Sequence, residues 1–260
     1  MKKLIIFNWK MNLPILSKRS EVIKSSTSPF SQKGRGDVEI VICPPFTHLE
    51  KVKTLLPSKI KLGAQNCFWE NAGAYTGEIS PKMLKNLGVE YVIIGHSERR
   101  RYLNETDQMI NKKVLAALKA GLKVVLCVGE PTRKAQIAER KAQVSYAKQY
   151  VKKQLQRDLK TISASRFAIS NLIIAYEPIW AIGSKQPDTP KDALEMIKYI
   201  KQFSIFNFQF SNPKVLYGGS VDSKNIESFI KYKEIDGALV GSASIKIKEV
   251  KEILKKVYGK

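Results

Sequence analysis

Apolar residues gather in short, nearly continuous runs that recur from one end of the chain to the other. β-branched side chains dominate these runs, which is typical of strands. The runs do not alternate with polar positions, and strands covered on both faces of a parallel sheet have this composition. We therefore expect eight strands, over Leu4–Phe7, Val38–Cys43, Ile60–Gly63, Tyr91–Ile94, Lys123–Val128, Leu172–Tyr176, Lys214–Tyr217 and Gly237–Val240.

Segments with a helical period separate the expected strands. Apolar residues recur every four positions over 110–118 and again over 151–159. Thr47 followed by Glu50 fits a capping box, and Thr189 followed by Pro190 predicts a helix start. Helices are expected to stop at two glycines that precede strands, Gly88 and Gly121.

Eight strand–helix units in sequence predict an α/β fold, a (β/α)8 barrel that forms one domain over residues 1–260. An open, doubly wound sheet is the alternative. No G-x-G-x-x-G motif follows the first strand, which weakens that alternative. The segment from Ser25 to Gly36 fits the pattern least, and we expect a surface helix end and a loop there.

Polar residues follow several of the expected strands directly. In a (β/α)8 barrel, functional residues lie on the loops after the carboxyl ends of the strands. The residues at these positions are Asn8 and Lys10 after the first strand, His96 and Glu98 after the fourth, Glu177 after the sixth, Gly218–Ser220 after the seventh, and Gly241–Ser242 after the eighth. An acid, a histidine, a lysine and two glycine-rich turns should therefore meet on one face.

Each of these groups suggests a chemical role. Glu177 follows an apolar strand and precedes Pro178, so it should border a water-poor pocket and serve as a general base, with a solvated carboxylate at the start of a loop as the alternative. His96 also follows an apolar strand, and polar neighbours can fix its tautomer. Asn8 and Lys10 are two apart, so on an extended segment both should point into the pocket and stabilise an oxyanion.

The two glycine-rich turns predict a phosphate site. Backbone N–H groups exposed in such turns bind anions, and the loops after the last two strands are where barrels of this kind hold phosphate. Turn formation alone would explain one glycine pair, but two pairs at both expected loops favour a ligand. The other histidine, His48, receives no role.

Composition limits the other function classes. The chain carries 45 Lys and Arg against 23 Asp and Glu, a formal charge of +22. Its lysines are spread along the whole length without an aromatic–basic motif, so we expect a solvated basic surface and no specific nucleic-acid partner. Three widely spaced cysteines argue against disulfides and zinc, and two of them lie in strand-like runs.

The apolar pattern suggests neither a membrane span nor a secretory signal. No stretch approaches the roughly 20 apolar residues that a membrane span requires. The apolar run at the start stops after Phe7, which is too short for a secretory signal. We expect a cytosolic protein.

Several segments resemble the triosephosphate isomerase family, in the order and positions that the family shows. They are Asn8–Asn12, Cys43–Pro45, Gly63–Asn66, Tyr75–Glu78, Gly95–Arg100, Cys127–Glu130, Ala175–Gly183 and Tyr217–Val221. The resemblance extends from the first strand to the last helix. It implies a cofactor-free, metal-free isomerase that interconverts dihydroxyacetone phosphate and glyceraldehyde 3-phosphate.

The resemblance also implies roles for individual residues. Glu177 would be the base, His96 the neutral electrophile, and Lys10 with Asn8 the oxyanion-stabilising pair, with Glu98 in support. The phosphate would be held by a set of loop residues, Gly183, Ser220, Gly241 and Ser242. Thr76, on the loop after the third strand, would insert into the partner subunit of a homodimer.

Two departures from the family pattern affect the loops. The lid continues after Gly183 with Ser184 and carries Pro187, which should stiffen its far end. Ser242 stands where a second glycine is usual. Another phosphate-binding barrel enzyme, an aldolase or an epimerase, remains an alternative, as does non-specific polyanion binding through the basic surface.

Overall fold

The computed structural model describes residues 2–12, 38–132, 140–162, 169–182 and 188–259. Eight parallel strands close into a barrel in sequence order, with β1 paired to both β2 and β8. The strands are β1 (Lys3–Asn8), β2 (Val38–Cys43), β3 (Ile60–Ala64), β4 (Tyr91–Ile94), β5 (Lys123–Val128), β6 (Leu172–Tyr176), β7 (Lys214–Tyr217) and β8 (Gly237–Val240). The expected (β/α)8 fold is thereby confirmed.

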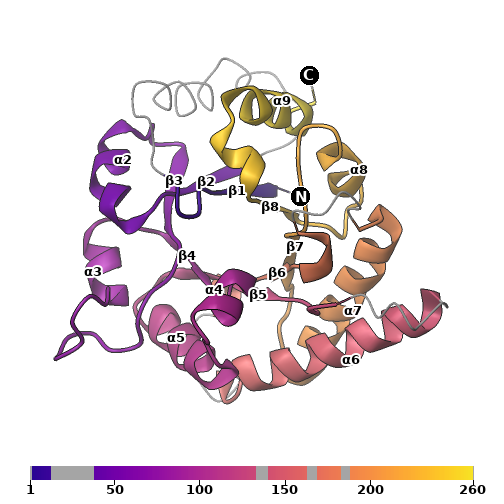
Figure 1. Cartoon of the computed structure of the whole chain (residues 1–260), viewed down its shortest axis with the longest axis horizontal. Coiled ribbons are helices and arrows are strands. Elements are labelled where there is room, and N and C mark those ends of the chain that lie inside the picture. The colour runs from indigo at the N-terminus through magenta and orange to yellow at the C-terminus, as the bar shows by residue number, and fades with distance from the viewer. Residues whose placement is uncertain (1, 13–37, 133–139, 163–168, 183–187, 260) are drawn as a thin grey trace.

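Helices surround the barrel and follow its strands (Figure 1). The α-helices are α2 (Leu49–Leu55), α3 (Pro81–Asn86), α4 (Ser97–Tyr102), α5 (Asp107–Lys119), α6 (Arg140–Asp158), α7 (Pro190–Phe208), α8 (Ile226–Ile230) and α9 (Ile247–Val257). Short 3-10 turns are η2 (Phe46–His48), η4 (Ile169–Asn171), η5 (Ile179–Ala181) and η6 (Ser242–Ile245). Within the described part of the chain, no helix is both long and apolar enough to cross a bilayer.

The continuous apolar runs are explained by two cores, one on each side of the strands. In β1, Leu4 and Ile6 belong to a cluster built from strand residues alone, which fills the barrel interior. Ile5 and Phe7 belong to the larger cluster that includes residues of the surrounding helices. Because successive side chains point to opposite faces, both sets must be apolar, and no polar alternation remains.

Most of the expected helix boundaries are confirmed. Thr189 caps α7 by accepting a hydrogen bond from the Asp192 backbone N–H at 3.1 Å, and Pro190 occupies the first turn. Gly88 and Gly121 follow α3 and α5 with φ of +89° and +75°, the left-handed conformation that glycine adopts without a steric penalty.

The capping box at Thr47 and Glu50 is wrong. A 3-10 turn precedes α2, so the residue at the helix N-cap is His48 and no side chain caps it. The Thr47 hydroxyl instead lies 2.8 Å from Nδ1 of His48. The segment from Ser25 to Gly36 lies outside the described residues, and the one-domain expectation for residues 1–260 stays a prediction.

Candidate active site

Glu177 lies at the carboxyl end of β6, where strand pairing continues for one more residue. Its backbone N–H donates to the Val128 carbonyl at 2.8 Å, and its side chain is buried, with the residue 2% exposed. One carboxylate oxygen, Oε2, accepts a hydrogen bond from the Ser97 backbone N–H at 3.3 Å. The other, Oε1, lies 3.4 Å from Nε2 of His96. The base and the histidine predicted from sequence therefore face each other directly.

His96 is held in one tautomer by its place at the start of α4. It is the N-cap residue of this helix, and its Nδ1 accepts the backbone N–H of Glu98 at 3.2 Å. A nitrogen that accepts a hydrogen bond carries no proton, so this contact favours the tautomer with the ring proton on Nε2. The Glu98 carboxylate lies farther from Nδ1, at 3.7 Å, and is engaged by Lys10.

Lys10 and Asn8 both border the same cavity, but the extended geometry expected for this segment is wrong. Lys10 has a φ of +51°, and its backbone N–H donates to Oδ1 of Asn8 at 3.0 Å. The turn, and not strand alternation, brings the two side chains together. The Lys10 ammonium lies 2.6 Å from Oε1 of Glu98, which links the first loop to the fourth.

The glycine-rich turns after β7 and β8 line this cavity too. Its volume is about 430 Å³, and its walls are Asn8, Lys10, His96, Glu177, Ile182, Gly218, Gly219, Ser220, Val221, Leu239, Gly241 and Ser242. Ser242 has no positive φ, because the non-glycine residues with positive φ in the described chain are Lys10, Asn104, Thr161 and Gln209. Serine therefore brings no backbone strain to this position. Gly183 lies outside the described residues.

The site is supported by several residues that the sequence did not reveal as functional. Gln65 donates through Nε2 to the carbonyl of Lys10 at 3.0 Å, which supports the strained turn. Ser244 donates its hydroxyl to the carbonyl of Asn8 at 2.8 Å. At Gly129, a Cβ atom would collide with the carbonyl group of Glu177. Gln65 lies within a motif that resembles the family, but nothing in the sequence showed which backbone group it reaches.

A profile described as triosephosphate isomerase matches residues 3–257. The chain belongs to the triosephosphate isomerase family. Triosephosphate isomerases from Alkaliphilus metalliredigens and Thermoanaerobacter pseudethanolicus are 43% and 44% identical, and each alignment covers 94% of this chain and 95% of the relative. The triosephosphate isomerase of Aquifex aeolicus is 42% identical over the same shares of both chains.

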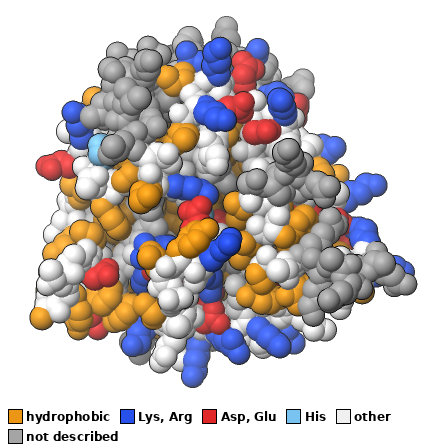
Figure 2. Space-filling model, in the orientation of Figure 1, with side chains coloured by type: hydrophobic (Ala, Val, Ile, Leu, Met, Phe, Trp, Pro, Cys, Tyr) orange, Lys and Arg blue, Asp and Glu red, His pale blue; other side chains and the backbone are white. Residues whose placement is uncertain are grey.

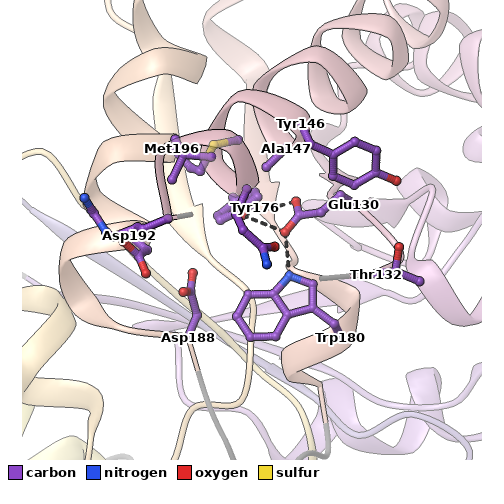
Figure 3. A pocket seen from close by; sticks show the side chains of 12 residues that line it. Glu130, Thr132, Tyr146, Ala147, Tyr176, Trp180, Asp188, Asp192 and Met196 are labelled. Carbon is purple, nitrogen blue, oxygen red and sulfur yellow. Dashed lines mark hydrogen bonds and ion pairs between the residues drawn. The ribbon is translucent and has the colours of Figure 1, made fainter. Parts of the chain in front are cut away.

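A second cavity borders the segment that leads out of β6. Its volume is about 380 Å³, and Figure 3 shows Glu130 between Tyr176 and Trp180 on its wall. Oε1 of Glu130 accepts a hydrogen bond from Nε1 of Trp180 at 2.6 Å, and both carboxylate oxygens lie 3.2 Å from the Tyr176 hydroxyl. These contacts fix η5, and Ile182 immediately after it lines the active-site cavity.

The loop after β3 of this triosephosphate isomerase family member carries Thr76 at an exposed position. The base of the loop is closed by a hydrogen bond from the Phe68 N–H to the Ile79 carbonyl at 2.8 Å. The ring of Phe68 lies 4.8 Å from that of Tyr75, centroid to centroid. The loop is therefore braced by its own side chains.

The remaining expectations concern cysteines and charge. Cys43, Cys67 and Cys127 are all buried thiols without disulfides, as expected for small apolar side chains. Among the described residues on the face seen in Figure 2, Lys and Arg side chains are scattered and form no single patch. That distribution fits a solvated basic surface.

Proposed function

We propose that the protein interconverts dihydroxyacetone phosphate and D-glyceraldehyde 3-phosphate by proton transfer through an enediol intermediate. The observation that carries this proposal is the juxtaposition of Glu177 and His96, 3.4 Å apart in one cavity with Lys10. Family membership supports the same conclusion.

The proposed reaction assigns one proton to each group. The Glu177 carboxylate takes a proton from the carbon beside the carbonyl, and the Nε2–H of His96 donates to the carbonyl oxygen as negative charge develops there. His96 then recovers a proton from the neighbouring hydroxyl, and Glu177 returns its proton to the other carbon. A carboxylate base paired with a neutral histidine is the mechanism that membership of the triosephosphate isomerase family implies.

The contacts of Glu177 suit this role. Its hydrogen bond from the Ser97 N–H, at 3.3 Å, and its contact with Nε2 of His96, at 3.4 Å, are both longer than most protein hydrogen bonds. A substrate can therefore replace them at little cost. The Lys10 ammonium, on the same side, would stabilise the oxyanion, and Glu98 would keep Lys10 in place through their ion pair.

The phosphate would bind at the turns that contain Ser220, Gly241 and Ser242. Glycine leaves the backbone accessible, and N–H groups in such turns suit phosphate oxygens. Gly183 would complete this site, as the resemblance implies. The net positive charge of the protein would also raise the rate at which it encounters the anionic substrate.

We also propose a homodimer in which Thr76 of one subunit reaches the partner near its active site. Large apolar side chains lie exposed on the loops and helices after β1 to β4, as an interface would require: Met11, Phe46, Tyr75, Met83, Tyr102 and Leu103. The braced loop around Thr76 would lose little conformational freedom on docking. The protein would act in the cytoplasm, in glycolysis and gluconeogenesis.

Substitution of the base tests the proposed reaction. Glu177→Gln should lower kcat by about 10²- to 10⁴-fold, while KM changes little, because proton abstraction occurs only in the transition state. The measurement is a coupled assay with glyceraldehyde 3-phosphate in the presence of a chelator. Glu50→Gln, at an exposed carboxylate on α2, is the matched control and should keep full turnover. Near-normal turnover in Glu177→Gln would rule out the mechanism.

A further inference from the structure

Arg100 lies behind His96, on the side away from the cavity. It belongs to α4, the helix that His96 caps, but its side chain folds back toward the barrel. Its Nε donates to the carbonyl of Gly95 at 2.8 Å, and Nη2 lies 3.4 Å from the carbonyl of Cys127. One guanidinium therefore contacts the ends of β4 and β5, the strands that lead to His96 and to the backbone partner of Glu177.

The bond to Gly95 acts on His96 directly. The Gly95 carbonyl and the His96 N–H belong to one peptide group, and a peptide group is planar. Fixing the carbonyl oxygen therefore fixes the direction in which the chain enters His96. Gly95 has a φ of +72°. A Cβ atom at this position would lie 3.1 Å from Nη2 of Arg100 and 3.3 Å from the Cys127 carbonyl, so the packing here is close.

Two carboxylates from neighbouring helices hold the guanidinium in this position. Asp158, at the end of α6, lies 2.5 Å from Nη2, and Asp107, at the start of α5, lies 2.6 Å from Nη1. Helices α4, α5 and α6 lie on the same side of the barrel (Figure 1). Four N–H groups that point in fixed directions from a rigid plane suit this arrangement, and a lysine ammonium could not reproduce it.

Arg100 favours the charged form of the Asp158 carboxyl. It is fully buried, and within the described residues its second oxygen, Oδ1, has no hydrogen-bond partner. Burial raises the pKa of the Asp158 carboxyl to about 7, and the positive charge of Arg100 opposes this rise. Above neutral pH the buried carboxylate therefore has Arg100 as its counter-charge.

We infer that Arg100 is a positioning residue for the isomerisation: braced by Asp158 and Asp107, it fixes the Gly95–His96 peptide and thereby sets where the imidazole meets the substrate oxygens. This inference rests on the proposed function. Arg100 does not touch the cavity, and it acts only through the backbone that carries His96.

The test combines kinetics with an observation of His96 itself. In Arg100→Lys, kcat should fall about ten- to a hundredfold with KM within about twofold, since small displacements of catalytic groups cost this much. The chain has 2 histidines, so nitrogen NMR of histidine-labelled protein resolves each ring. The His96 signals should shift or broaden as the single tautomer is lost, and those of His48 should stay unchanged.

Arg157→Gln is the matched control. Arg157 is exposed, and its Nη1 lies 3.3 Å from Oδ2 of Asp107, the oxygen that Arg100 does not use. It therefore touches the same cluster but not the Gly95 carbonyl. It should leave kcat and the His96 signals as in the unmodified protein. A purely structural role for Arg100 predicts a lower melting temperature with normal kcat in the folded protein, and that result would overturn the inference.

A second variant covers the case in which Arg100→Lys does not fold. Asp158→Asn keeps the arginine and removes its buried counter-charge, so the same changes should appear in smaller size at pH 8. Unchanged kcat and unchanged His96 signals in a folded Asp158→Asn protein would also overturn the inference. If the unmodified protein lacks isomerase activity, the proposed function fails, and the NMR comparison still decides whether Arg100 positions His96.

Discussion

The side chain of Glu177 packs against Gly218 on the neighbouring strand end. A Cβ atom at position 218 would lie 2.8 Å from Cγ of Glu177, which is closer than side-chain atoms approach each other. The backbone of Gly218 is itself fixed, because its N–H donates to the Tyr176 carbonyl at 2.8 Å. The glycine therefore positions the proposed base, Glu177, as well as lying in the turn that the sequence predicts to bind phosphate.

Substituting this glycine should displace the base without removing it. We expect Gly218→Ala to lower kcat/KM by about ten- to a hundredfold, because Glu177 must move by several tenths of an ångström or more. Steady-state kinetics and a thermal melt on the same preparation provide the measurement. Full activity with an unchanged melting temperature would show that the site yields freely and that Glu177 is not held here.

Side-chain chemistry at the site could be predicted from the sequence, whereas the turns that orient it could not. Asn8, Lys10, His96 and Glu177 were placed at one face because they follow strands, and they line one cavity. The left-handed turn at Lys10 could not be foreseen. Lysine has no intrinsic preference for positive φ, and the turn depends on distant partners such as Gln65.

At the scale of strands and helices, local pattern carried most of the information. The runs from Val38 to Cys43 and from Lys123 to Val128 form strands with the predicted bounds, because burial on both faces leaves a continuous apolar signal. The start of α2 was predicted wrongly. A 3-10 turn over Phe46–His48 moves the N-cap from Thr47 to His48, and side-chain preferences do not encode such a shift.

The amino-terminal end of the barrel contains a polar cluster that joins three strands. Glu39 of β2 accepts a hydrogen bond from the Tyr91 hydroxyl of β4 at 2.5 Å, and Lys123 of β5 lies 3.4 Å from the same carboxylate oxygen. Burial by itself would raise the pKa of Glu39, but Tyr91, Lys123 and Lys2 together lower it below its ordinary value of 4.5. The folded state therefore prefers the charged carboxylate.

The direction of this pKa shift fixes the pH dependence of stability. A carboxyl whose pKa is lowered on folding stabilises the protein above its unfolded pKa, and this contribution is lost as the pH falls through the folded value. Glu39→Gln should therefore destabilise the protein at pH 7 by about 1 kcal/mol, at the low end for a charged hydrogen bond because water reaches the cluster. The difference should shrink at about pH 3.5, because the carboxyl is mostly protonated there in the unfolded state.

Urea unfolding at the two pH values measures this difference. Glu90→Gln is the control, since Glu90 pairs with Lys61 at 3.0 Å in a more exposed setting and should have little effect at either pH. Isomerase turnover of Glu39→Gln should be normal at pH 7, because Glu39 lies near the start of β2 and Glu177 follows the end of β6. A loss of stability that does not vary with pH would contradict the assigned charge.

At the scale of the whole molecule, the two ends of the barrel carry different kinds of side chains. Chemistry-bearing side chains line the mouth at the carboxyl ends of the strands, and polar pairs such as Glu39 with Tyr91 close the opposite end. Exposed apolar residues lie on the loops and helices that follow β1 to β4. A partner subunit that covers them would bury apolar surface and shield the edge of the active site together.

Oligomeric state and activity should therefore change together when the loop after β3 is altered. Thr76→Arg places a bulky charge at the exposed tip, where desolvation in an interface is costly, so we expect mainly monomer at micromolar concentration. Turnover should fall at least about tenfold, since the loops next to Lys10 and His96 lose their cover and catalytic positions loosen. Sedimentation velocity and the coupled assay measure the two effects.

Thr54→Arg, at an exposed threonine of α2, is the control and should leave both the oligomeric state and the turnover unchanged. A monomer with full turnover would show that each barrel works alone, and an unaltered dimer would place the interface elsewhere.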